Sequence, residues 1–91
     1  MQTNLVTQRL TQASLAATLR AECARRSVGQ SALALHLGLS QPAVSRRLRG
    51  DVPLTVPELA AVAELLGMSP EDLLAAARTS PVAPLPEPSQ P

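Results

Sequence analysis

Three arginines lie within four positions of the stretch "GLSQPAVSRRLRG", residues 38–50, and no acidic residue accompanies them. A surface helix usually interleaves charges of both signs, because opposite charges one turn apart attract each other. Guanidinium groups bind phosphate oxygens and the edges of guanine bases through paired hydrogen bonds. Arg46, Arg47 and Arg49 therefore indicate a helix whose negative partner is a phosphate-lined surface outside the chain.

The charge distribution along the chain points the same way. Residues 1–50 contain seven arginines and one acid, a net charge of +6, whereas residues 51–91 contain one arginine and six acids, a net charge of −5. Such a split favours an anionic partner for the first half of the chain. The alternative is that the two halves are solvated faces of opposite sign.

The elements that must position these arginines are helices. The 91 residues include no Phe, Tyr or Trp, so the core must consist of Leu, Val, Ala and Met, and Ala and Leu favour helix. A first helix is expected between residues 7 and 26, with Leu10, Leu15, Leu19 and Cys23 at helical spacing. A second is expected over residues 30–37, ended by Gly38.

Local start and stop signals predict three further helices and no strand. Ser40 is a good N-cap for the third helix, which Gly50 ends. Thr55 and Glu58 form a capping box at the start of the fourth. Residues 69–72 repeat the start signal for a short fifth helix that is expected to end at Ala77, and its apolar anchors are Leu73 and Leu74. The predicted fold is an all-α, compact five-helix domain.

Residues 30–49, "QSALALHLGLSQPAVSRRLR", meet the demands of a helix-turn-helix. Ala34 is small where the two helices cross, Gly38 makes the turn, and Leu39 fills the corner. Val44 and Leu48, four residues apart, seat the third helix on the core. Together with "TVPELAAVAELLGMSPEDLL", residues 55–74, this stretch resembles the phage Cro/C1-repressor type of DNA-binding domain, the xenobiotic-response-element family.

The resemblance covers about residues 15–77, and it implies that the third helix enters the major groove of double-stranded DNA. It also implies that Gln30 binds a backbone phosphate and that Ser40 and Gln41 open the recognition helix. At Arg46–Arg49 the chain departs from the family pattern, because the apolar residue lies one place along and the acid is missing. The rotation of the third helix is therefore left open.

A helical wheel with about 100° per residue separates two sets of candidate contacts. The face opposite Val44 and Leu48, together with the N-terminus of the helix, is expected to contact bases through Gln41, Pro42, Ser45, Arg46 and Arg49. Phosphate contacts are expected from Gln30, Ser40, Arg47, Arg25 and Arg26. For Arg25 and Arg26, the alternative is a favourable interaction with the dipole of the first helix.

Other classes of function find little support in the sequence. One His, one Cys and no paired carboxylates predict no catalytic or metal site, and no cofactor is expected. The single cysteine and the lack of a signal peptide favour the cytoplasm. No apolar run approaches the ~20 residues of a membrane span.

The expected organisation is a flexible arm (residues 1–6), a helix-turn-helix domain (residues 7–78) and a disordered proline-rich tail (residues 79–91). The expected function is that of a sequence-specific DNA-binding regulator, a repressor from a phage or prophage. It would act as a weak homodimer, formed through the fifth helix, on a palindromic or near-palindromic operator, unless Leu73 and Leu74 both pack inside and the chain binds as a monomer. The alternative is an antitoxin or another protein-interaction module with the same fold.

Overall fold

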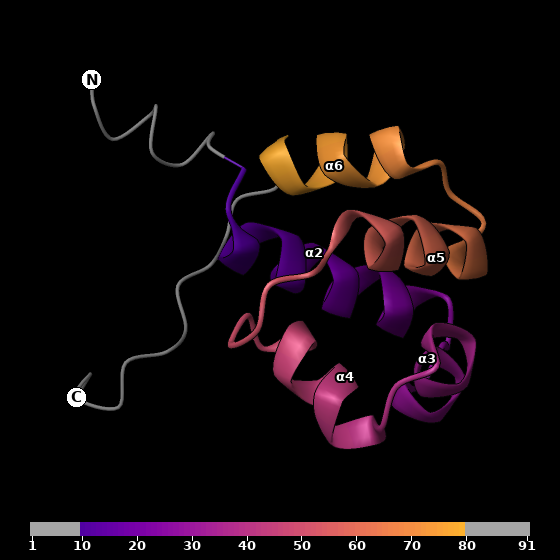
Figure 1. The fold of residues 1–91 in the computed structure, drawn as a ribbon. Coiled ribbons are helices and arrows are strands. Elements are labelled where there is room, and N and C mark those ends of the chain that lie inside the picture. Colours follow the sequence, from indigo (N-terminus) through magenta and orange to yellow (C-terminus); the bar gives the residue numbers. More distant parts are fainter. Residues whose placement is uncertain (1–9, 80–91) are drawn as a thin grey trace, which may run out of the picture.

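A computed structural model describes residues 10–79, and within this range the chain forms five α-helices and no strand. They are α2 (Gln12–Arg25), α3 (Gln30–Leu37), α4 (Gln41–Leu48), α5 (Val56–Leu66) and α6 (Pro70–Thr79). Helix α2 packs against α6 on one side and α4 on the other, and α3 contacts α4 and α5 (Figure 1). The predicted all-α, five-helix fold is confirmed.

Polar side chains cap the helix starts. Ser40 Oγ accepts a hydrogen bond from the Ala43 N–H at 3.2 Å, and Thr55 with Glu58 forms the predicted capping box. Ser69 Oγ accepts from the Asp72 N–H at the start of α6. These caps satisfy backbone donors that lack a partner inside the helix. The start signals of α4, α5 and α6 are thus confirmed.

The helix ends share one backbone geometry. Gly38, Gly50 and Gly67 have φ angles of 70°, 82° and 74°, the left-handed conformation that glycine adopts at no steric cost. Gly50 also lies close to α2, because a Cβ at this position would be 3.7 Å from Ala16 Cβ. After α2 the left-handed position is occupied by Ser27, with φ 58°, and not by a glycine.

The core contains the apolar residues that the helical spacing selects. Leu19, Leu33, Val44 and Leu73 are at most 1% exposed, and Cys23 is also buried. The apolar side chains of α5, Leu59, Val62 and Leu66, are buried as well. Half-buried side chains pack around the core, namely Leu37, Leu39, Leu48, Met68 and Leu74. The apolar anchors of the helix-turn-helix are therefore in the expected places.

The first helix differs from the expectation. It begins at Gln12, because Thr11 is its N-cap in a capping box with Ser14, and Leu10 precedes the helix with 38% exposure. The buried face of α2 also includes Ser14, Thr18 and Glu22, since this helix has neighbours on two sides. More residues of this central helix are buried than its apolar stripe alone predicts.

The ends of the chain are described only in part. The predicted arm (residues 1–6) and residues 80–91 of the predicted tail lie outside the described residues. Helix α6 extends to Thr79, two residues beyond the expected end. Within residues 10–79, none of the helices combines the length and the apolar character needed to cross a membrane.

Candidate nucleic-acid interface

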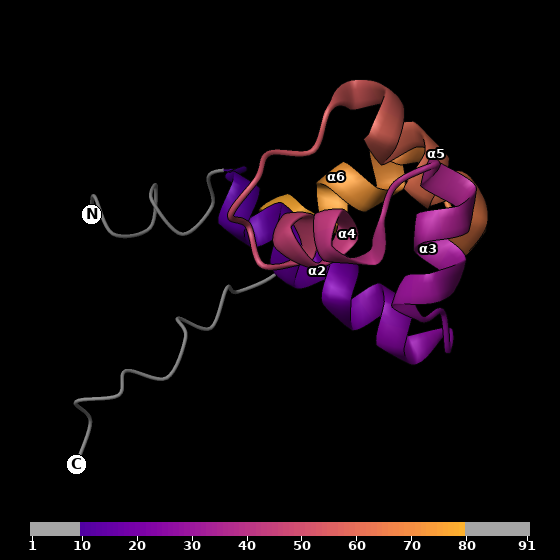
Figure 2. The same cartoon turned by 60° about the horizontal axis from the view of Figure 1, so that its bottom comes forward.

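Helix α4 presents one polar face to solvent. Val44 is 1% exposed and holds the opposite face on the core, and Leu48 is half-buried. Gln41, Pro42, Arg46 and Arg49 are exposed, and Ser45 is half-buried at the edge of this face. Figure 2 shows α4 at the front of the molecule, with α3 beside it and α5 and α6 behind. The structure thus gives the rotation that the sequence leaves open.

The N-terminal ends of α3 and α4 lie close together. The side-chain Nε2 of Gln41 donates to Ser31 Oγ at 3.0 Å, which joins the first residue of α4 to the first turn of α3. Gln30 is exposed at the start of α3, and the N-cap, Gly29, provides no side-chain hydrogen bond. The backbone N–H groups of this first turn can therefore donate hydrogen bonds to an anion, which the positive end of the helix dipole also favours.

Arg49 lies at the C-terminal end of the exposed face. Its Nη1 donates to Ser45 Oγ at 2.8 Å, and its Nε donates to a carboxylate oxygen of Asp51 at 3.0 Å. Both partners of the ion pair are 57% exposed, so the pair is weak and easily exchanged for another one. Ser45 holds the guanidinium along the outer face of α4.

Arg47 has partners inside the protein. Its Nε donates to Glu58 Oε1 at 3.0 Å, and its Nη1 donates to the carbonyl oxygen of Ala43 at 3.0 Å. The expectation that the arginines of this helix lack acidic partners is wrong for Arg47 and Arg49. The acids that pair with them come from the loop after α4 and from α5, so the composition of the helix alone does not reveal them.

Arg25 and Arg26 also have an acidic neighbour. Both guanidinium groups contact the Glu22 carboxylate, at 3.5 Å and 3.1 Å. Glu22 is 9% exposed, and its buried charge is compensated by these two cations. Arg25 keeps 65% of its side chain exposed, so one cation remains accessible at the end of α2.

Several of these residues line one hollow of about 280 Å³. Gln30, Ser45 and Arg49 line it together with Arg20 of α2. Arg20 donates to the carbonyl oxygen of Leu48, the last residue of α4. The sequence around Arg20 carries no signal of this contact, because its partner lies 28 residues away along the chain.

Two acids of the second half of the chain lie on α6, away from α4. The acids Glu71 and Asp72 lie in the first turn of α6. Helix α6 packs against the side of α2 opposite to α4. Near α4 the acidic groups are Asp51 and Glu58, each paired with an arginine. The exposed face of α4 is therefore available to a polyanion, with Asp51 as the acid at its edge.

Two ionisable groups have shifted pKa values. Burial, and to a lesser extent the Glu22 charge, raises the pKa of the Cys23 thiol. Burial acts to raise the pKa of Glu58, but the hydrogen bonds from Arg47 and Thr55 outweigh it and hold that pKa below its usual value. Cys23 is thus an unreactive core residue, and Glu58 is ionised at neutral pH.

Comparison with known proteins agrees with this geometry. A family model described as a helix-turn-helix domain matches residues 14–77, from the first turn of α2 to the last turn of α6. Searches of curated proteins and of solved structures gave no significant match.

Within residues 10–79, no group of three His, Cys, Asp or Glu side chains is placed to hold a metal ion.

Proposed function

Because the chain belongs to the helix-turn-helix domain family, we propose that it binds specific sequences of double-stranded DNA and regulates transcription as a Cro/C1-type repressor. The observation that carries this proposal is the exposed face of α4, where Arg46 and Arg49 lie opposite the buried Val44. A helix of this kind fits the major groove, where arginine reads guanine through two hydrogen bonds.

The proposed base contacts follow from the order of residues along α4. Gln41 and Pro42 are at its N-terminus, the end that enters the groove first in this family of folds. Ser45, Arg46 and Arg49 follow on the same face. We assign hydrogen bonds to guanine to the two arginines, a polar contact to Gln41 and Ser45, and an apolar contact to Pro42.

The proposed phosphate contacts flank the groove. Gln30 and the free N–H groups at the start of α3 would bind one phosphate, and Ser40, whose hydroxyl can still donate, would bind another. Arg25 and Arg26 would add charge at the end of α2. Each neutralised phosphate contributes roughly 0.9 to the slope of log affinity against log salt concentration.

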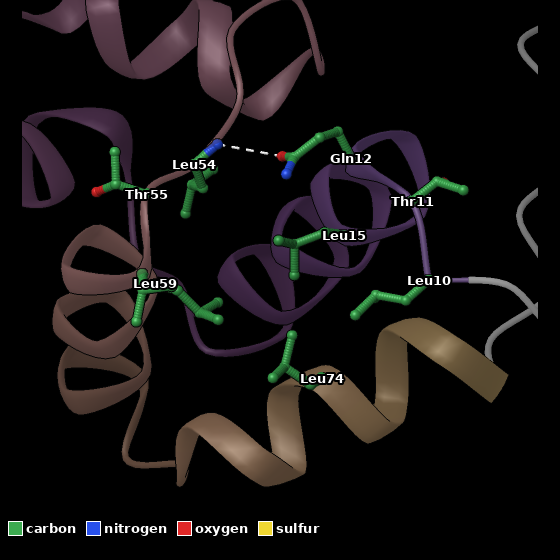
Figure 3. A pocket seen from close by; sticks show the side chains of 9 residues that line it. Leu10, Thr11, Gln12, Leu15, Leu54, Thr55, Leu59 and Leu74 are labelled. Carbon is green, nitrogen blue, oxygen red and sulfur yellow. Dashed lines mark hydrogen bonds between the residues drawn. The ribbon is translucent and has the colours of Figure 1, made fainter.

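A weak dimer is the proposed binding form, because one helix-turn-helix reads only a few base pairs. Leu73 is buried in the core, whereas Leu74 lines an open apolar hollow of about 460 Å³ together with Leu10, Leu54 and Leu59 (Figure 3). Val56, which is 78% exposed, adds to this patch. We propose that the patch contacts a second copy of the chain when both occupy an operator.

A binding-site selection from random DNA tests the function. The expected result is one enriched sequence, with relaxed preference at a guanine when Arg46→Ala is used. Arg78→Ala is the matched control, because Arg78 is an exposed arginine on α6, and it should leave the selected sequence unchanged. Failure of the unmodified chain to enrich any sequence would overturn the proposal.

Analytical ultracentrifugation tests the dimer. The free protein should sediment mainly as a monomer, and two copies should bind an operator with two half-sites. Leu74→Glu should abolish the second binding event and leave binding to a single half-site intact. A tight dimer at nanomolar concentration, or a one-to-one complex on the full operator, would contradict the proposed assembly.

A further inference from the structure

Few apolar side chains attach α4 to the core of the domain. The helix has only eight residues, and Val44 is its one fully buried side chain. Leu48 and Ala43 are half-buried. So small an apolar anchor leaves the rotation of a two-turn helix weakly determined. Other interactions must hold Arg46 and Arg49 in a fixed direction.

A single carboxylate oxygen provides such an interaction. Glu58 Oε1 accepts from Arg47 Nε at 3.0 Å and from the backbone N–H of Thr55 at 3.1 Å. The second contact is half of the capping box that starts α5, so this oxygen is held in place by the backbone. Arg47 in turn reaches the carbonyl oxygen of Ala43 within α4. The guanidinium therefore connects the backbone of α4 to the N-terminus of α5.

The environment of this pair distinguishes it from the other ion pairs near α4. The side chains of Arg47 and Glu58 are 18% and 17% exposed, against 57% for both members of the Arg49–Asp51 pair. Arg47 also lines a small apolar pocket together with Leu37, Leu48 and Val62. Ion pairs shielded from water are screened little by salt, and removal of one partner leaves a costly unpaired charge.

We propose that Arg47 and Glu58 are positioning residues that set the rotation of α4 on the domain, in place of the phosphate contact expected of Arg47. This inference rests on the proposed recognition of DNA by α4. Arg20 of α2, which donates to the Leu48 carbonyl oxygen, is a second link between α4 and the rest of the domain. Loss of the Arg47–Glu58 pair would let α4 turn, and Arg46 and Arg49 would lose their alignment with the bases.

The substitution Glu58→Gln separates the two roles of Arg47, because they predict effects of opposite sign. Glutamine keeps an acceptor for the capping box and removes the charge. If Arg47 binds phosphate, the loss of its competitor frees the guanidinium and tightens DNA binding. If Arg47 positions α4, specific binding weakens by about tenfold, the effect of losing one bidentate base contact.

The experiment measures affinity for the selected operator over a range of salt concentrations. Positioning predicts that Glu58→Gln and Arg47→Gln weaken binding alike, that the double variant is no weaker, and that the salt slope is unchanged. The matched control is Glu71→Gln, which removes an exposed acid from the first turn of α6 and should leave affinity unchanged. Tighter binding by Glu58→Gln, or a slope reduced by about 0.9 per subunit in Arg47→Gln, would overturn the inference.

Two further measurements keep the test decisive. Arg47→Lys retains a cation without the guanidinium fork, and it replaces Glu58→Gln if the Glu58→Gln variant fails to fold. If Arg47 positions α4, Arg47→Lys should weaken specific DNA binding and leave the salt slope unchanged. In the free protein, amide NMR shifts along α4 should move in both glutamine variants but not in the control. This readout needs no DNA, so it distinguishes failure of the positioning role from failure of the proposed function. Unmoved α4 shifts would contradict the inference.

Discussion

The substitution Asp51→Asn should strengthen DNA binding. Asp51 is the acid at the edge of the proposed interface, and its carboxylate holds Arg49 at 3.0 Å. Asparagine preserves the backbone, including the Asp51 N–H that bonds the Arg46 carbonyl at 2.9 Å and ends the helix. The change therefore removes one negative charge and one competitor for Arg49 with little effect on the fold.

The exposure of the pair sets the size of the effect. Both side chains are 57% exposed, and ion pairs of this kind contribute about 0.2–1 kcal/mol. Arg49 must give up this energy before it can bond a base. The affinity gain should therefore be about 1.5- to 5-fold at physiological salt, since 1.4 kcal/mol corresponds to a factor of ten. Fluorescence anisotropy of a labelled operator measures a change of this size.

Two controls make the result interpretable. Glu71→Gln removes a charge from α6 and should leave affinity nearly unchanged, because charges beyond the ~8 Å Debye length are screened. In an Arg49→Ala background, Asp51→Asn should lose most of its effect, because the competition no longer exists. Weaker binding by Asp51→Asn alone would show that Asp51 supports Arg49 in the complex and would refute the reasoning.

Three further predictions concern the fold, and circular dichroism at 222 nm follows each of them because the chain has no Trp or Tyr. Ser27→Gly should raise the free energy of unfolding by about 1 kcal/mol, because glycine relieves the left-handed φ of 58°; an unchanged urea midpoint would contradict this. Thr18→Val should stabilise the domain by about 1 kcal/mol, because Thr18 Oγ1 is buried without a hydrogen-bond partner among residues 10–79; Thr18→Ser, which keeps the hydroxyl, should not stabilise it. The pKa of Glu58 is lowered in the folded protein, so the contribution of its carboxylate to the free energy of unfolding is complete above the ordinary pKa of 4.5 and is lost as the pH falls through the lower folded value. Glu58→Gln should therefore lose less stability below about pH 5 than the unmodified chain does. Equal losses would contradict the lowered pKa of Glu58.

Local signals were enough to predict most of the helices. The capping residues Ser40 and Thr55 and the stop at Gly38 act within four residues of themselves, so their effect can be read directly from the sequence. The apolar spacing also selects Val44 as the buried anchor of α4, which indicates the side of the helix that is turned away from the core. The start of α2 was misjudged, because Leu10 continues the apolar spacing past the N-cap at Thr11.

The partners of the arginines could not be predicted in this way. Arg47 meets Glu58 across 11 residues, and Arg20 meets the Leu48 carbonyl across 28. These contacts depend on how α2, α4 and α5 pack, and neither charge counts nor a helical wheel contains that information. The wheel places Arg47 on the flank of α4, but it cannot tell whether the flank faces DNA or a neighbouring helix.

The central claim is that the exposed face of α4, with the start of α3 beside it, contacts DNA. The most direct test is a titration of the isotope-labelled protein with its selected operator, followed through backbone and arginine side-chain NMR signals. We expect large changes at the start of α3 around Gln30 and along α4 from Gln41 to Arg49, with α6 little affected within each subunit except near Leu74. Changes centred on the exposed residues Asp72, Ala75 and Thr79, on the face of α6 turned away from Leu74, with α4 unperturbed, would contradict this proposal.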